Sequence, residues 1–165
     1  MPRLVEFLSR DSNRKLQFEA AWVLTNIASG ASNQTRSVVE HGAVPFFVRL
    51  LSCGNPEVVE QAIWALGNIA GDGPNFRDLV LDAGIVKPMM TLTRDPNMFH
   101  KDTNQPSAQI LQNIAWTMSN LCRNKVTGLR FLINGAKTSS KTVWQNLVLD
   151  SSTEGLKMTR YFRVR

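Results

Sequence analysis

Apolar residues recur along most of the chain at intervals of three and four, the spacing of one face of a helix. This spacing predicts long helices over residues 16–29, 57–72 and 110–123. No stretch alternates apolar and polar residues as a half-buried strand does, so the body is predicted to be all-α. On the second long helix the apolar stripe fills an arc of about 120°; its members are Val59, Ala62, Ile63, Leu66, Ile69 and Ala70.

Two shorter helices are predicted between successive long ones. The first follows Asn33 or Asn75, each placed as an N-cap, where an asparagine side chain accepts a backbone N–H. The second follows Gly42 or Gly84, since glycine commonly ends a helix. Pro56 is placed in the first turn of a long helix, where its missing N–H costs nothing.

Each long helix contains a tryptophan followed four residues later by an asparagine; the pairs are Trp22 and Asn26, Trp64 and Asn68, and Trp116 and Asn120. The first two tryptophans are 42 residues apart and the next two are 52 apart. A period near 42 falls in the range of HEAT and armadillo repeats. The extra residues of the second interval are assigned to the polar, proline-bounded segment 94–107, which is predicted to be a loop.

A tryptophan at helical spacing is ordinarily a core residue, but a helical wheel places all three on the polar face. Trp64 falls about 160° from the centre of the apolar stripe at 100° per residue. Residues four apart are neighbours on a helix, and stacked repeats bring equivalent faces side by side. The three pairs are therefore predicted to form a row, called here the Trp–Asn ladder. Exposed aromatic residues in a row indicate a binding surface.

The chemistry of the Trp–Asn ladder suits a basic peptide. An asparagine amide has a donor and an acceptor, so it can pair with the backbone of an extended peptide of any sequence. Slots between indole rings suit long aliphatic stems, and the ring faces attract cations. Acceptors for a charged head are available from Glu57, Glu60, Gln61 and Asp72.

The segments WVLTNIASG, WALGNIAGDG and WTMSNLCRNK resemble the signature helices of the importin alpha (karyopherin alpha) family, adaptors that recognise nuclear localisation signals. FRDLVLDAG and GAVPFFVRLL match as well, and the resemblance extends from residue 1 to about residue 125. It implies a right-handed α-solenoid of armadillo repeats, found in cytoplasm and nucleus, whose concave groove binds lysine-rich signals of cargo proteins. The family's basic N-terminal segment, which binds importin beta, is absent from this sequence.

The resemblance also implies which positions contact the peptide: Trp22, Asn26, Ser29, Gly30, Thr35, Gln61, Trp64, Asn68, Gly71, Asp72, Trp116, Asn120 and Arg123. Asp72 matches the carboxylate that pairs with the most buried lysine of the signal. Ala31 departs from the family, in which threonine is common there, and this removes one weak contact.

The net charge of +6 is concentrated at the end of the chain, since residues 126–165 hold 7 Lys and Arg but 2 Asp and Glu. A basic, nucleic-acid-binding body is therefore not indicated. Residues 126–165 contain no further Trp–Asn pair, because Trp144 is followed at the fourth position by Val148. They are predicted to be a poorly ordered tail unrelated to the family.

No enzyme is indicated. Cys53 and Cys122 are too few for a disulfide framework or a four-ligand zinc site, and His41 and His100 are isolated. The sequence has no catalytic triad pattern, phosphate-binding loop or HExxH motif, so no cofactor or metal is expected. No run reaches the roughly 18 apolar residues of a membrane span. Two alternatives to an import adaptor stay open: a generic armadillo scaffold, and a truncated product that competes for signals or is inactive.

Overall fold

The computed structural model describes residues 1–93 and 108–123. The chain divides into two units, Met1–Gly128 and Leu129–Arg165, and all described residues belong to the first. The predicted loop over 94–107 and the predicted tail over 126–165 lie outside the described residues. Within the described ranges every regular element is an α-helix, as the periodicity predicts; the helices are α1 (Pro2–Phe7), α2 (Arg14–Ala28), α3 (Ser32–Glu40), α4 (Ala43–Leu50), α5 (Pro56–Gly71), α6 (Pro74–Asp82), α7 (Val86–Leu92) and α8 (Ala108–Cys122).

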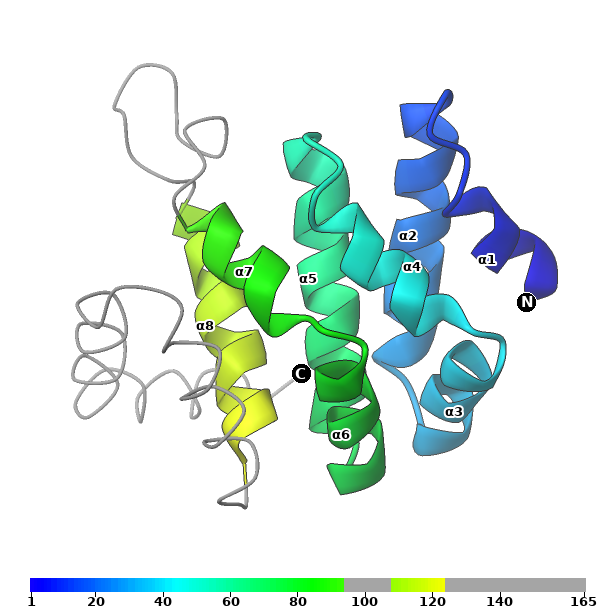
Figure 1. Cartoon of the computed structure of the whole chain (residues 1–165). Coiled ribbons are helices and arrows are strands. Elements are labelled where there is room, and N and C mark those ends of the chain that lie inside the picture. Colours follow the sequence, from blue (N-terminus) through cyan, green and yellow to red (C-terminus); the bar gives the residue numbers. More distant parts are fainter. Residues whose placement is uncertain (94–107, 124–165) are drawn as a thin grey trace. The chain divides into compact units, whose positions relative to one another are not determined.

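The three long helices α2, α5 and α8 are the ones predicted, to within two residues at either end. Two short helices separate each long helix from the next. Helix α5 packs against α2 on one side and α8 on the other, so it is the central element of this unit (Figure 1). None of the helices in the described ranges is long and apolar enough to cross a membrane.

The predicted ends of the short helices are partly right. Gly42 and Gly84 have φ angles of 76° and 84°, in the left-handed region that favours glycine, and separate the two short helices of each repeat. Asn33 and Asn75 are not N-caps, because those positions belong to Ala31 and Gly73.

A different side chain caps α3. The Oε1 atom of Gln34 accepts the backbone N–H of Ala31 at 2.8 Å, so the first turn is satisfied from inside the helix. Asparagine does cap two long helices, since Asn13 accepts the N–H of Leu16 and Asn55 that of Val58. Pro56 follows in the first turn of α5, as predicted.

The core is centred on α5. All six residues of its predicted apolar stripe are buried, with exposures of 0–4%. Val58 and Ala65, outside that stripe, are also fully buried, because α5 has a long helix on each side. On α8, the apolar residues Ile110, Ile114, Met118 and Leu121 are buried, whereas Leu111 is 37% exposed.

Candidate peptide-binding site

Two of the three ladder tryptophans are exposed, as the helical wheel predicts. Trp22 on α2 is 48% exposed and Trp64 on α5 is 42% exposed, which places both outside the apolar core. Trp116 on α8 is half-buried. The two exposed rings lie at equivalent positions of α2 and α5, so the face that carries them is the candidate binding surface.

The third tryptophan lies against a glycine that the sequence analysis did not single out. A Cβ atom on Gly67 would come within 2.2 Å of Cζ3 and 2.7 Å of Cε3 of Trp116. Gly67 is therefore required for the indole of Trp116 to approach the backbone of α5. The available signal was a glycine inside a long helix, three residues after Trp64, because glycine there weakens a helix unless close packing needs it.

The asparagines of the ladder also hold the long helices together. The Nδ2 of Asn68 donates to the carbonyl of Thr25 at 3.3 Å, and that of Asn120 donates to the carbonyl of Gly67 at 3.0 Å. Both acceptors lie three residues after the tryptophan of the preceding long helix. The fold thus uses one amide hydrogen that the sequence analysis had assigned to a peptide. In Asn68 and Asn120, this bond leaves the second amide hydrogen and the Oδ1 lone pairs unused.

The three asparagines of the ladder differ in how far they are exposed to solvent. Asn26 is exposed and its side chain bonds to no other described residue. Asn68 is half-buried. Asn120 is only 3% exposed, which corrects the expectation that it lies on an open polar face. Its burial follows from its place beside Gly71, where a Cβ would meet its Nδ2 at 3.0 Å.

Hydroxyl side chains add further bonds between the long helices. The hydroxyl of Thr117 donates to the carbonyl of Ile63 at 3.1 Å. The hydroxyl of Thr25 shares its hydrogen between the carbonyl of Ala21 in its own helix, at 2.8 Å, and that of Gln61 on α5, at 3.2 Å. A carbonyl already bonded within its helix has a second lone pair for such a donor. The interfaces of α5 with α2 and α8 are therefore partly polar, which a wheel that assigns polar residues to solvent cannot anticipate.

Two expected contact residues are buried instead. Gln61 is 9% exposed, and its Oε1 has no hydrogen-bond partner within the described structure. Thr35 is fully buried, and its hydroxyl donates to the carbonyl of Ala28 at 3.1 Å, near the end of α2. Both side chains are buried, but only that of Thr35 has a hydrogen-bond partner for its buried oxygen.

Ser29 and Gly30 lie exposed in the turn after α2. The hydroxyl of Ser29 donates to the carbonyl of Asn26 at 2.8 Å. A Cβ on Gly30 would come within 2.1 Å of the Oε1 of Gln34, so glycine here leaves room for the side chain that caps α3. Gly30 therefore has a structural role in addition to the contact expected of it.

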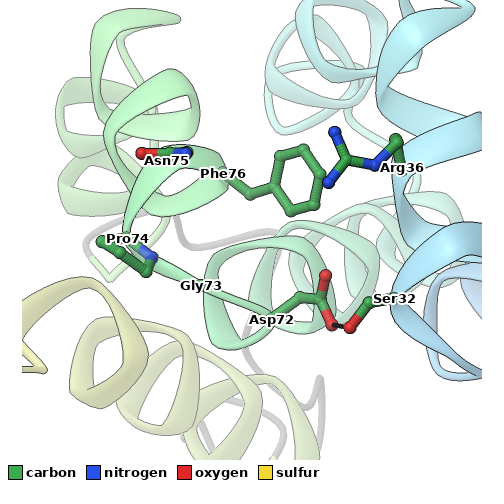
Figure 2. A pocket seen from close by; sticks show the side chains of 7 residues that line it. All are labelled: Ser32, Arg36, Asp72, Gly73, Pro74, Asn75 and Phe76. Carbon is green, nitrogen blue, oxygen red and sulfur yellow. Dashed lines mark hydrogen bonds between the residues drawn. The ribbon is translucent and has the colours of Figure 1, made fainter.

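Asp72 ends α5 and faces the preceding repeat. The hydroxyl of Ser32 donates to its Oδ1 at 2.7 Å (Figure 2). This pair borders a cavity of about 290 Å³; its lining residues are Ser32, Arg36, Asp72, Gly73, Pro74, Asn75 and Phe76. Asp72 follows Trp64 by two helical turns, so its carboxylate lies at the end of the ladder face of α5.

A second carboxylate lies one turn before Trp64. Burial raises the pKa of Glu60, and the nearby charge of Glu57 raises it further. A cation brought to this position would relieve both effects, because it stabilises the charged form of the carboxylate. Glu60 is thus a carboxylate whose charged form is disfavoured by burial and by Glu57.

Arg123 follows the end of α8 and has an exposed side chain, but its backbone carbonyl forms a hydrogen bond within the fold. The Nη1 of Arg77 donates to the carbonyl of Arg123 at 2.7 Å. Arg77 itself is only 4% exposed and also donates to the Oδ1 of Asp78. The role of Arg77 cannot be identified from the sequence, since a single arginine in a short helix carries no signal of burial.

Comparison with known proteins agrees with this arrangement. The armadillo/beta-catenin-like repeat family matches residues 1–29 and 32–71. The designed armadillo repeat protein YIII(Dq)4CqI superposes with a TM-score of 0.72 at 24% identity, covering 89% of this chain and 61% of that one. A second design, solved in complex with the peptide (KR)4, gives a TM-score of 0.71 at 24% identity, covering 88% and 60% of the two chains. These likenesses show an armadillo solenoid fold.

Sequence relatives are more specific. Importin subunit alpha-2 of Arabidopsis thaliana is 50% identical over 125 residues, which are 76% of this chain and 22% of the relative. Importin subunit alpha-1b of Oryza sativa subsp. japonica has the same identity and coverage, and the probable importin subunit alpha-A of Dictyostelium discoideum is 42% identical over 130 residues, 76% and 24% of the two chains. These relatives support an importin alpha fragment over about three quarters of the chain. It spans about a fifth of the length of the curated relatives that it matches.

The expected contact positions of this importin alpha segment fall into three settings. Those at the surface are Trp22, Asn26, Ser29, Gly30, Trp64 and Arg123. Those that are half-buried are Asn68, Gly71, Asp72 and Trp116. Those that are buried between helices are Thr35, Gln61 and Asn120. Of the surface and half-buried members, Trp116 lies on α8 and Arg123 follows it, while the others lie on α2 and α5 or in the turns that end them.

Proposed function

We propose that this importin alpha segment binds an extended, lysine-rich peptide along the Trp–Asn ladder, as part of an adaptor for nuclear protein import. The observation that carries the proposal is the exposure of Trp22 and Trp64 at equivalent positions of α2 and α5. Neither ring has a place in the core, and each has an asparagine one turn further along its helix.

The chemistry of the surface fits lysine better than an apolar side chain. A lysine stem packs between indole rings while its ammonium reaches a carboxylate. Asp72 and Glu60 supply carboxylates on the ladder face of α5. Asn26 and the second amide hydrogen of Asn68 are available to the peptide backbone.

The partners of this function are cargo proteins that carry basic nuclear localisation signals. Importin beta is the further partner that membership of the family suggests, and the adaptor would move between cytoplasm and nucleus. The names of the importin subunit alpha relatives, at about 50% identity, support this assignment.

The test is a titration of the purified chain with a lysine-rich peptide, using Trp22→Ala and Trp64→Ala. Each substitution is expected to weaken binding by at least about tenfold, because buried aromatic contacts dominate interface energies. Leu79→Ala is the matched control, since Leu79 is 40% exposed on α6 and lies outside the ladder. Circular dichroism of each variant checks that the helices are retained.

A second control replaces the lysines of the peptide with glutamine. Binding that survives this change, or that both tryptophan variants leave intact, would contradict the proposal. A folded chain that binds other proteins but no lysine-rich peptide would instead support a generic armadillo scaffold.

A further inference from the structure

Two side-chain contacts join α3 to the following repeat on either side of the cavity in Figure 2. In the first, Ser32 donates to Asp72 at 2.7 Å. In the second, the guanidinium of Arg36 lies over the ring of Phe76, with Cζ 5.6 Å from the centroid. Ser32 and Arg36 are one turn apart on α3, so the cavity lies between a carboxylate and a guanidinium.

The charge of Arg36 is not neutralised by its neighbours. Arg36 is exposed, and no carboxylate in the described ranges forms an ion pair with it. Its planar head has five N–H donors, and the contact with the Phe76 ring limits the orientations that the head samples. An oriented guanidinium without an anion is suited to bind a carboxylate from a ligand.

The carboxylate opposite keeps its capacity for a cation. One oxygen of Asp72 accepts from Ser32, but a carboxylate offers about four lone-pair sites. A ligand that enters between the two contacts therefore meets a negative and a positive group. A peptide that carries only positive charge satisfies Asp72 and leaves Arg36 unpaired.

We propose that Arg36 recognises an acidic side chain of the bound peptide, two residues from the lysine that Asp72 holds. The proposal rests on the proposed function and adds to its ligand a specific feature: one glutamate or aspartate within a lysine-rich segment. Side chains at positions i and i+2 of an extended peptide share a face and are roughly 6.6 Å apart. Ser32, whose hydroxyl bonds to Asp72 and so marks its position, is one helical turn from Arg36, and Cβ atoms at this separation are about 6 Å apart.

The experiment is a glutamate scan of the lysine-rich peptide against the full chain. Each non-lysine position carries glutamate in one peptide and glutamine in its partner, so that shape is held constant while charge changes. Glutamate at one position, two residues from the lysine read by Asp72, is expected to bind about two- to fivefold more tightly than glutamine, the range for an exposed ion pair. High salt is expected to reduce this preference.

Arg36→Ala is expected to abolish the preference for glutamate while leaving the affinity for the glutamine peptide within about twofold. Arg36→Glu is expected to reverse it, so that lysine at the same position binds more tightly than glutamate. The matched control is Arg49→Ala, because Arg49 also lies over a ring, with Cζ 5.3 Å from the centroid of Phe46, but does not line the cavity.

The outcomes separate this inference from the function on which it rests. If the chain binds the lysine-rich peptide but shows no glutamate preference, or shows one that Arg36→Ala leaves unchanged, the role of Arg36 is overturned and the proposed function stands. If no lysine-dependent binding is found with any peptide, both are overturned.

Discussion

The indole of Trp116 lies directly against Gly67, although 49 residues separate them in the sequence. Gly67 is three residues after Trp64 on α5, and residues three apart are neighbours on a helix surface. The helix that carries the second ladder tryptophan therefore also positions the third. The position of the Trp116 ring therefore depends on the absence of a side chain at Gly67.

Gly67→Ala is expected to displace the ring of Trp116, since the new methyl group would overlap it. Overpacking of this kind costs about 1–3 kcal/mol, against a gain of about 1 kcal/mol from helix propensity. Affinity for a lysine-rich peptide is expected to fall mainly through the lysine next to Trp116. Titrations with single-alanine peptides and tryptophan fluorescence measure both effects.

The double variant Gly67→Ala with Trp116→Leu provides the control. A smaller side chain at position 116 relieves the overlap with the ring but not with the Thr117 hydroxyl, which a Cβ at position 67 would approach to 2.6 Å, so the loss of stability is expected to be smaller than in Gly67→Ala alone. Unchanged tryptophan emission and unchanged peptide affinity in Gly67→Ala alone would contradict the positioning role.

Asp72 and Asn68 are expected to recognise different parts of the peptide, a lysine side chain and the backbone. Asp72→Ala is expected to cost roughly 2–5 kcal/mol of binding free energy, because a partly enclosed lysine ammonium loses its partner. The loss should disappear for the one peptide in which that lysine is already alanine. Asn68→Ala is expected to weaken all peptides alike, because the amide contacts the peptide backbone.

Asn68 also contributes to the stability of the fold. Its bond to the carbonyl of Thr25 is lost in Asn68→Ala, which is expected to lower the free energy of unfolding by about 1 kcal/mol. Asp72→Asn keeps an acceptor for Ser32 while removing the charge, and so isolates the electrostatic part. An equal loss for the parent peptide and every alanine variant in Asp72→Ala would show that the assigned lysine pocket is wrong.

Arg77→Met is expected to lower the free energy of unfolding by roughly 3 kcal/mol, measured by urea denaturation. The reason is that the buried guanidinium donates to the carbonyl of Arg123 and to Asp78, and hydrogen bonds to charged groups are among the stronger ones. Arg49→Met is the matched control and is expected to change stability by less than about 0.5 kcal/mol, because Arg49 is exposed. Equal effects of the two substitutions would contradict the structural role of Arg77.

The raised pKa of Glu60 predicts that the free energy of unfolding depends on pH. Its pKa is raised in the folded chain by burial and then by Glu57, so the folded state binds this proton more tightly than the unfolded state does. The contribution of Glu60 to stability therefore decreases as pH rises from about 4.3, the unperturbed glutamate value, through the raised pKa. Above that range Glu60→Gln is expected to be more stable than the parent chain.

Thermal unfolding across pH 4 to 8, roughly the interval in which carboxylates and their perturbed forms titrate, measures this difference. The gain from Glu60→Gln should shrink at the acid end, where the carboxyl is already protonated. Glu57→Gln is the control and should give a smaller gain of the same sign, because it removes only the second cause. A gain that is constant with pH would contradict the assignment.

The sequence by itself determined the three long helices and the exposure of two of the ladder tryptophans. Helical periodicity placed α2, α5 and α8 and put Trp22 and Trp64 opposite the apolar stripe, because these features depend on positions within one helix. Gly42 and Gly84 ended the first short helices because a positive φ is a local requirement that glycine meets.

Tertiary structure decided how the polar residues are used. A helical wheel divides each helix into an apolar and a polar side, but α5 has a long helix on each of two sides. Gln61 and Asn120 are therefore buried although they are polar, and Asn120 is satisfied by the carbonyl of Gly67. The proximity of Trp116 to Gly67, and of Arg36 to Asp72, depends on how repeats stack, and stacking is set by contacts between helices far apart in the sequence rather than by the pattern within any one of them.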